Sequence, residues 1–298
     1  MALRNYLAGE VAEDFAGGLS SRREALRRLG LLGLGVGAAA SLLAACGQPS
    51  DSSAGAAGTA GAPPGRGPNT PRGTDIRFAG PAGQLRGAWA APAKSAGLPK
   101  AGVLVVHENK GLTEHFYDLV GRFAGVGYGA LCVDLLSAQG GTAALTDPAQ
   151  PPAVLAAAPD EALLADLRSG ISELARRVPG RKIGAVGFCF GGGMVWRLLA
   201  AGEARLAAAV PFYGPAPERP DFSRAKAAVL ALYGQKDLRV NETQDAADAA
   251  MLHANLVHLS TVYPGADHAF FNDSGPRYDP VAAANAWQAT IDWLGRYL

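Results

Sequence analysis

Apolar segments typical of strands alternate with segments of helical periodicity through residues 75–298. The strand-like segments are 76–78, 85–90, 102–107, 129–134, 182–187, 206–212, 227–233 and 257–263. The helical segments are 114–124, 160–177, 190–201, 242–255 and 278–298. Because helices separate most of the strands, the pattern predicts an α/β domain with a mainly parallel sheet and helices on both faces. Residues 139–159 form a long connection, which is expected to be a loop or a partial lid.

One of the predicted turns between a strand and a helix carries a cysteine. Residues 187–193 read Gly-Phe-Cys-Phe-Gly-Gly-Gly, between the strand 182–187 and the helix 190–201. A nucleophile at such a turn needs small residues two positions before it and two after it, because its strained backbone brings neighbouring chain close on both sides. The pattern predicts a nucleophile elbow in which Cys189 replaces the usual serine.

An acid and a histidine follow later strands, in the order that a nucleophile elbow requires. Asp237 comes just after the next-to-last predicted strand, and His268 comes just after the last one. The functional crevice of an open α/β sheet lies beyond the carboxyl ends of the strands, so Cys189, Asp237 and His268 are predicted to form a triad there. Asp267 is the rival acid, and Asp237 is favoured because the fold places the acid after an earlier strand.

These motifs resemble those of the dienelactone hydrolase family, a branch of the α/β-hydrolases with a Cys-Asp-His triad. The resemblance covers about residues 75–298, and its most specific segments are 106–112, 133–137, 187–193, 210–214 and 263–270. It implies an α/β-hydrolase fold and the hydrolysis of an ester or lactone. The family has a glutamate after the first parallel strand that contacts the nucleophile's thiol and helps to ionise it. By resemblance, this residue is Glu108.

The chemistry of a thiol nucleophile requires a base and an oxyanion hole. An unperturbed thiol has a pKa of about 8.5 and is mostly protonated at neutral pH. His268, oriented by Asp237, is the predicted base, and the helix that begins after Cys189 favours the thiolate. The N–H of Phe190 is one oxyanion donor by the elbow rule, and by resemblance the N–H of Asn109 is the other. Water activated by the histidine would then hydrolyse the thioester.

The residues around the predicted site give only partial information about the substrate. The dienelactone enzymes grip a substrate carboxylate with two arginines, and the matching positions here are Ala138 and Asn272. Without those guanidinium groups a bidentate carboxylate clamp is not evident. Arg277 is either a replacement or a surface residue. Tyr213 and Phe270 are expected either to line an apolar pocket or to belong to the core.

Residues 1–46 have the organisation of an export signal. A basic segment, 22–28, precedes an apolar run over 29–45 that ends in Leu-Ala-Ala before Cys46. This order predicts a signal peptide, with a retained membrane anchor as the alternative. The paired arginines resemble a twin-arginine signal, and residues 43–46 resemble a bacterial lipobox in which Cys46 is lipidated. The sequence therefore predicts a lipid-anchored protein on the periplasmic side of a membrane.

The segment after the predicted signal has too little bulk to form a core. Residues 47–74 are dominated by Gly, Ala, Ser, Pro and Thr and are expected to form a disordered tether. After the first 46 residues the chain carries 22 basic and 22 acidic residues, which gives no electrostatic case for nucleic acid. About 225 residues remain for one domain, and a monomer is expected.

The three cysteines have different settings. Cys132 lies inside a predicted strand and is expected to be an ordinary buried residue. The spacing of cysteines and histidines predicts no disulfide, metal site or cofactor. The sequence thus predicts a cysteine-dependent hydrolase that cleaves an ester or lactone through a thioester. The alternatives are a thioesterase or peptidase of the same fold, and a non-catalytic, lipid-tethered binding protein.

Overall fold

The computed structural model describes residues 3–45, 63–67, 70–93 and 97–298. Its eight strands form one sheet in the order β1-β2-β4-β3-β5-β6-β7-β8. The strands are β1 Thr74–Gly80, β2 Gly83–Ala90, β3 Gly102–Val106, β4 Gly129–Asp134, β5 Ile183–Phe188, β6 Leu206–Phe212, β7 Ala228–Gly234 and β8 His258–Tyr263. β2 pairs antiparallel with both β1 and β4, and all other neighbouring strands are parallel. The predicted mainly parallel sheet of an α/β-hydrolase is confirmed.

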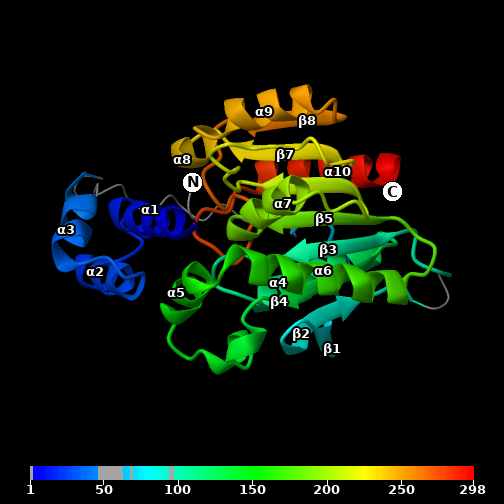
Figure 1. Ribbon diagram of the computed structural model, residues 1–298, viewed down its shortest axis with the longest axis horizontal. Helices are drawn as coiled ribbons and strands as arrows, with labels where there is room; N and C mark the ends of the chain where they lie inside the picture. The colour runs from blue at the N-terminus through cyan, green and yellow to red at the C-terminus, as the bar shows by residue number, and fades with distance from the viewer. Residues whose placement is uncertain (1–2, 46–62, 68–69, 94–96) are drawn as a thin grey trace.

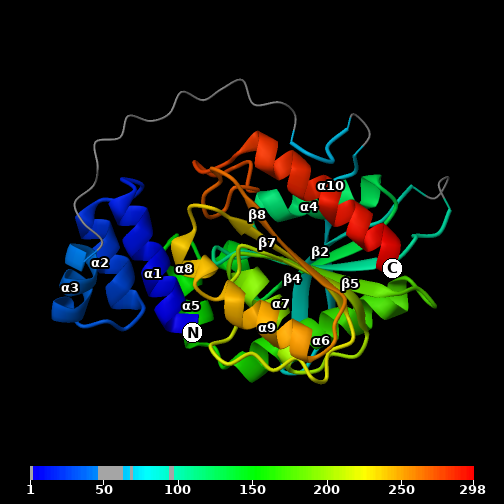
Figure 2. The same cartoon turned by 90° about the horizontal axis from the view of Figure 1, so that it is seen from above.

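Helices cover both faces of this sheet, as predicted (Figure 2). One face carries α4 (Glu114–Gly125) and α10 (Pro280–Tyr297), and the other carries α6 (Asp160–Arg177), α7 (Phe190–Ala200) and α9 (Gln244–His253). Strands β3, β4, β5 and β7 are buried at every position, because both of their faces are covered. The predicted helix 242–255 is shorter in the structure, and a separate short helix, α8 (Leu238–Asn241), precedes it.

The long connection after β4 is ordered by one aspartate. The carboxylate of Asp134 accepts hydrogen bonds from the N–H groups of Leu136 and Thr142, at 3.1 and 2.7 Å, and from the Thr142 hydroxyl at 2.8 Å. The connection contains the 3₁₀ turns η2 (Ser137–Gln139) and η3 (Thr142–Ala144) and the helix α5 (Gln150–Ala157). The predicted lid segment therefore includes a helix, and α5 lies beside the N-terminal helices (Figure 1).

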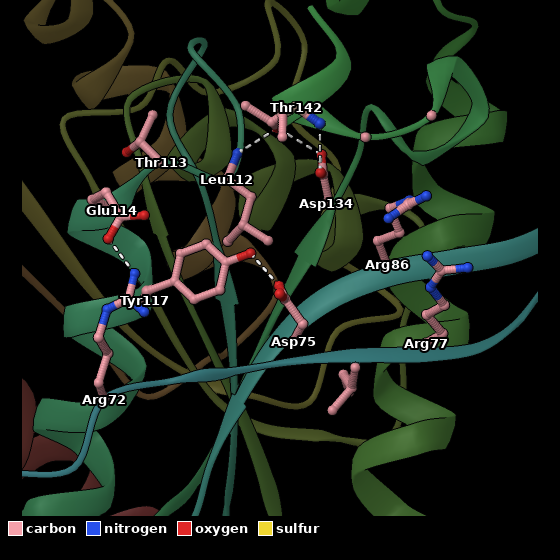
Figure 3. A pocket seen from close by; sticks show the side chains of 14 residues that line it. Arg72, Asp75, Arg77, Arg86, Leu112, Thr113, Glu114, Tyr117, Asp134 and Thr142 are labelled. Carbon is pink, nitrogen blue, oxygen red and sulfur yellow. Dashed lines mark hydrogen bonds and ion pairs between the residues drawn. The ribbon is translucent and has the colours of Figure 1, made fainter.

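A surface hollow of 860 Å³ lies between this connection, the start of α4, the edge strand β1 and its neighbour β2. Figure 3 shows Asp134 and Thr142 on one side of it and Tyr117, which donates to Asp75 at 2.5 Å, on another. Arg77 and Arg86 lie along the strands that border it. None of the predicted catalytic side chains lines this hollow, so it is separate from the site described below.

Three helices precede the sheet: α1 (Leu3–Ala16), α2 (Arg22–Leu31) and α3 (Val36–Ala45). They pack on one another beyond the carboxyl ends of the parallel strands, beside α5 and α8 (Figures 1 and 2). The apolar run predicted over 29–45 is divided between α2 and α3, with Gly33 in a left-handed conformation between them. Among the described helices, none combines the length and apolarity needed to cross a bilayer.

Part of the predicted tether packs on the domain. Residues 47–62, like Cys46, lie outside the described residues. Farther along, Arg66 donates to Asp118 of α4 at 3.1 Å, and the N–H of Gly73 donates to the Tyr117 carbonyl at 2.8 Å. These contacts join Arg66 and Gly73 to α4, while Arg66, Gly67 and Arg72 remain exposed.

Candidate active site

Cys189 lies at the turn between β5 and α7. Its φ of 55° and ψ of −119° are strained for a residue with a side chain. The N–H of Cys189 donates to the carbonyl of Phe212 at 3.0 Å, so the neighbouring strand β6 holds the turn in place. The predicted elbow is therefore present in the backbone.

The two glycines around the cysteine are required by close backbone contacts. A Cβ at Gly187 would lie 2.2 Å from the carbonyl oxygen of Gly191. A Cβ at Gly191 would lie 2.2 Å from the carbonyl oxygen of Val106. Because real Cβ atoms do not approach backbone oxygens so closely, the elbow can pack against β3 only with glycine at both positions.

The other two predicted triad residues meet at the same edge of the sheet. Nδ1 of His268 lies 2.6 Å from Oδ2 of Asp237, and both side chains are buried. Asp237 also accepts from the N–H of Val240 at 3.4 Å, and so caps α8. The rival acid, Asp267, accepts from the backbone N–H of His268 at 2.7 Å and does not contact its ring. The carboxylate that orients the imidazole is that of Asp237.

An unexpected side chain, Glu10 of α1, lies between the thiol and the imidazole. Its Oε1 accepts from the Cys189 thiol at 2.9 Å and from the Tyr6 hydroxyl at 2.7 Å. The same oxygen forms an ion pair with Nε2 of His268 at 3.0 Å, without good hydrogen-bond direction. Its Oε2 accepts from the side-chain amide of Asn109. The carboxylate of Glu10 therefore occupies the space in front of the nucleophile.

Burial and the neighbouring carboxylates Asp237 and Glu10 shift the pKa values of the site. Burial raises the pKa of Cys189 to about 12, and the Glu10 charge acts in the same direction. Burial lowers the pKa of His268, but the Asp237 carboxylate and the contacts with Cys189 and Glu10 raise it well above its ordinary value. Burial raises the pKa of Glu10, but His268 and Arg239 together lower it to about 2. The thiol is thus protonated, and the predicted base already carries its proton.

Glu108, assigned by resemblance to modulate the thiol, forms other contacts in this structure. Its Oε1 accepts from the Tyr213 hydroxyl at 3.2 Å, and its Oε2 accepts from the Asn272 side chain at 2.7 Å. Asn272 is the residue at the position of an expected arginine, so the amide there serves to hold the glutamate. The expected contact between Glu108 and the Cys189 thiol is replaced by the contact with Glu10.

The expected oxyanion donors lie on either side of the elbow. Phe190 is the first residue of α7, so its N–H has no acceptor within the helix. Asn109 follows β3, whose carboxyl end packs against the elbow, and its side chain already binds an anionic oxygen of Glu10. The oxyanion hole formed by the backbone N–H groups of Phe190 and Asn109 stays a prediction.

The aromatic side chains expected near the site are buried around the imidazole. The ring of Tyr213 lies edge-on to His268, with 5.2 Å between their centroids. Phe270 packs on Tyr213 at 5.3 Å and is fully buried. Tyr213 therefore borders the catalytic histidine, whereas Phe270 lies behind it in the core.

Two arginines, Arg239 and Arg277, lie where α1 meets the site, a region called here the mouth of the site. Arg277 is not an ordinary surface residue, because its guanidinium is largely buried and pairs with Asp14 of α1 at 3.1 Å. Arg239 of α8 pairs with Glu13 of α1 at 2.8 Å, and its guanidinium lies 4.4 Å from the Tyr6 ring centroid. Ala138, the other position of an expected arginine, is exposed on η2. Neither Arg239 nor Arg277 is at a position where the resemblance implies an arginine that binds the substrate carboxylate.

Glu10, Cys189 and His268 also include the atom types that bind soft divalent metals. A carboxylate oxygen, a sulfur and a ring nitrogen lie within 4.8 Å of one another. These are the residues that could hold such an ion within the described chain. Here the three groups bind one another, and a metal would have to displace the Glu10 contacts. Cys132 is far from any such role, because it is fully buried in β4.

Sequence reasoning missed the contribution of α1, including Tyr6 and Glu10. The basic and apolar pattern of residues 22–46 indicates an export signal, and residues 3–16 are assigned to that signal and not to the site. Leu3, Leu7 and Val11 recur every four residues, a spacing that predicts a helix with one apolar face packed against another element. That spacing predicts burial of the helix but does not say against what.

Comparisons with known proteins agree with the fold. The dienelactone hydrolase family model matches residues 85–298. A Salmonella typhimurium protein is 34% identical over 209 residues, which are 65% of this chain and 77% of the relative. An Escherichia coli K12 protein is 33% identical over 224 residues, which are 70% of this chain and 82% of the relative. Both relatives are named "Putative carboxymethylenebutenolidase".

Solved structures give the same result. A "Putative Dienelactone Hydrolase" from Klebsiella pneumoniae has 32% sequence identity and a TM-score of 0.68, over 76% of this chain and 98% of its own. A metagenomic "Dienelactone Hydrolase-like Promiscuous" phosphotriesterase, P91, has 26% identity and a TM-score of 0.65, with the same coverage. The family match begins at residue 85 and so does not include the three N-terminal helices. From residue 85 onward, the chain belongs to the dienelactone hydrolase family of α/β-hydrolases.

Proposed function

We propose that the protein hydrolyses an ester or lactone through a thioester on Cys189. The observation that carries the proposal is the line of contacts from Asp237 through His268 to the elbow. Nδ1 of the imidazole lies 2.6 Å from Asp237, and its Nε2 faces the side of the ring where the thiol lies. A strained, buried cysteine beside an oriented imidazole has the geometry of an activated nucleophile.

The reaction follows from these positions once the substrate carbonyl replaces the Glu10 carboxylate. Nε2 of His268 takes the thiol proton as Sγ of Cys189 bonds to the carbonyl carbon, and the N–H groups of Phe190 and Asn109 stabilise the oxyanion. The carbon–oxygen bond to the leaving group breaks, and the imidazolium gives its proton to the leaving oxygen. Water then gives a proton to Nε2 and attacks the thioester, which releases the acid and the free thiol.

Further features support a hydrolase of this kind. The curated relatives are named putative carboxymethylenebutenolidases, and the family match over residues 85–298 includes the elbow and both triad loops. Glu108 lies close enough to act on the site through Tyr213 and Asn272, as a positioning residue. The arginines at the mouth, Arg239 and Arg277, favour substrates that tolerate or carry negative charge.

The test of the proposal is to trap the thioester. When the full chain carrying Glu10→Gln, in which the carboxylate charge no longer holds the space in front of the sulfur, is mixed with p-nitrophenyl acetate and quenched in acid, the expected result is one added acetyl group, mapped by peptide mass spectrometry to Cys189. Release of p-nitrophenol should show a burst, because a low-turnover acyl-enzyme accumulates. Cys132, which is fully buried and whose pKa is raised well above its ordinary value by burial, is the internal control. Acetylation of other side chains only, or none at all, would reject the mechanism.

We also propose that residues 1–46 are an export signal that is cut just before Cys46, so that residues 1–45 are removed and Cys46 is lipidated at the new N-terminus. The basic segment before a short apolar run supports this, and Arg22 and Arg23 are exposed at the start of α2. The expected mature protein in membranes of a Gram-negative host begins at Cys46 and carries lipid on that residue, as measured by intact mass. Cys46→Ala should then leave the leader attached. An unlipidated full-length chain recovered from the cytosol of that host would contradict the proposal.

A further inference from the structure

The helix α1 is bound in the active site by a specific set of polar contacts. Its buried face presents Tyr6, Leu7, Glu10 and Val11 at helical spacing. Glu10 is 7% exposed, and both of its carboxylate oxygens bind groups of the catalytic site: Oε1 binds the Cys189 thiol and His268, and Oε2 binds Asn109. A buried carboxylate is stable only when its charge is compensated in this way. The site therefore fits this side chain as it would fit a ligand.

The acids that follow Glu10 reach the two arginines at the mouth. Glu13 pairs with Arg239 at 2.8 Å, and Asp14 pairs with Arg277 at 3.1 Å. Glu10, Glu13 and Asp14 lie within about one turn of the helix. The single helix α1 therefore binds the Cys189 thiol and both arginines at the same time. This complementarity of charge identifies α1 as the occupant of the mouth.

The docked helix is incompatible with catalysis. Oε1 of Glu10 lies 2.9 Å from the nucleophilic sulfur, where the substrate carbonyl has to lie. The two cannot occupy that space together. The nearby negative charge also disfavours the thiolate, and it adds to the effect of Asp237, which raises the pKa of His268. Both the position and the charge of Glu10 therefore oppose the first step of the reaction.

The contact between the N-terminal helices and the domain is only partly packed. A hollow of 770 Å³ lies between α1, α3 and α8, lined by residues of all three helices. Leu238, which borders it, is 72% exposed. The helix is thus held both by its polar contacts and by apolar side chains, such as Leu7 and Val11, that belong to the buried core, and the hollow leaves part of the contact unfilled.

On the basis of the proposed function, we propose that residues 3–16 are an intramolecular competitive inhibitor anchored by Glu10. The enzyme becomes active when this segment leaves the site. Arg22 and Arg23 stay exposed while α1 is docked, so the paired arginines of the proposed leader are accessible in the inhibited form. Removal of residues 1–45 during export would then also remove the inhibitor, which confines activity to the processed protein.

The first test compares Glu10→Gln with the wild type in the full chain. Loss of the anchoring charge removes the ion pair with His268, and alkylation of Cys189 by iodoacetamide at neutral pH is expected to rise about 10-fold or more. Hydrolysis of p-nitrophenyl acetate should rise in parallel. Glu161→Gln, an exposed glutamate on α6, is the matched control and should behave as the wild type. Equal labelling of Cys189 in the Glu10→Gln and wild-type chains would overturn the inhibitor.

A second test does not depend on how the variant folds. A protease recognition site placed within residues 50–58 allows the folded full chain to be cut, and dilution then lets the N-terminal piece dissociate. Activity and Cys189 labelling should rise on cutting, and a peptide of residues 3–16 should lower both again. The same peptide carrying Glu10→Gln should be at least about 10-fold weaker. No change on cutting, or equal inhibition by the two peptides, rejects the proposal.

These results separate the inhibitor from the enzymatic mechanism. Labelling of Cys189 reports occupation of the site even for a chain that hydrolyses no ester. If labelling of Cys189 rises in Glu10→Gln while no acyl-enzyme forms, the hydrolase mechanism is rejected and the inhibitory role of residues 3–16 is supported. If Cys189 is acylated equally fast in the wild type and in Glu10→Gln, the hydrolase mechanism is supported and the inhibitory role of residues 3–16 is rejected. Labelling of the fully buried Cys132 indicates that a variant is unfolded. In that case the experiment with the protease-cut chain tests the inhibitory role of residues 3–16.

Discussion

Replacing Cys189 with alanine is expected to lower kcat/KM for an aryl ester by about 10⁴-fold or more, because the nucleophile itself is removed. Alanine keeps a side chain at the strained φ of 55°, so the elbow should form as before and the thermal midpoint should change little. Initial rates over a range of ester concentrations measure the loss. The assay is run in the wild-type background and again with Glu10→Gln. The second background ensures that occupation of the site by α1 does not hide the loss of kcat/KM caused by Cys189→Ala.

The matched control for this prediction is Cys132→Ala. Cys132 is buried in β4 and has no contact with the site, so this variant should keep its activity with a small loss of stability. The double variant Cys189→Ala with His268→Ala should be no slower than Cys189→Ala alone, since the two residues act as one unit. Residual activity within about 10-fold of the parent after Cys189→Ala would mean that another group performs the chemistry.

Replacing Asp237 with asparagine is expected to lower kcat/KM by about 10²- to 10⁴-fold. The single side-chain oxygen of asparagine can keep the cap on the Val240 N–H, which leaves the NH₂ group facing Nδ1 of His268. That arrangement favours the tautomer with its proton on Nε2, which cannot accept the thiol proton. Activity measured across pH reports the effect.

The pH profile gives this prediction a second, signed readout. The Asp237 charge raises the pKa of His268, and the base is active only above its pKa. Loss of that charge lowers the pKa, so the acidic limb of kcat/KM should move to lower pH while the maximum falls. Asp267→Asn is the control, because Asp267 binds only the backbone N–H of His268 and should leave the profile in place. If the Asp267 variant loses more activity than the Asp237 variant, the assignment of the acid is wrong.

Local rules were enough to predict the elbow and the loops that face it. The close approach at Gly187 and Gly191 follows from the turn itself, so the glycine spacing around the cysteine carried the information. Asp237 and His268 could be placed because the carboxyl ends of parallel strands share one edge of a sheet. The contacts of Glu108 with Tyr213 and Asn272 could not be predicted, since they join segments about 100 and 160 residues apart in sequence.

The sequence by itself determined the α/β class, the alternation of strands and helices and the positions of Cys189, Asp237 and His268, because these depend on periodicity and on short-range backbone geometry. Only the tertiary structure decided what occupies the space in front of the sulfur. Glu10 is 179 residues from Cys189 along the chain, and its charge finds partners only where α1 meets the sheet edge. A side chain's protonation and access to substrate depend on all groups packed around it, which local pattern does not encode.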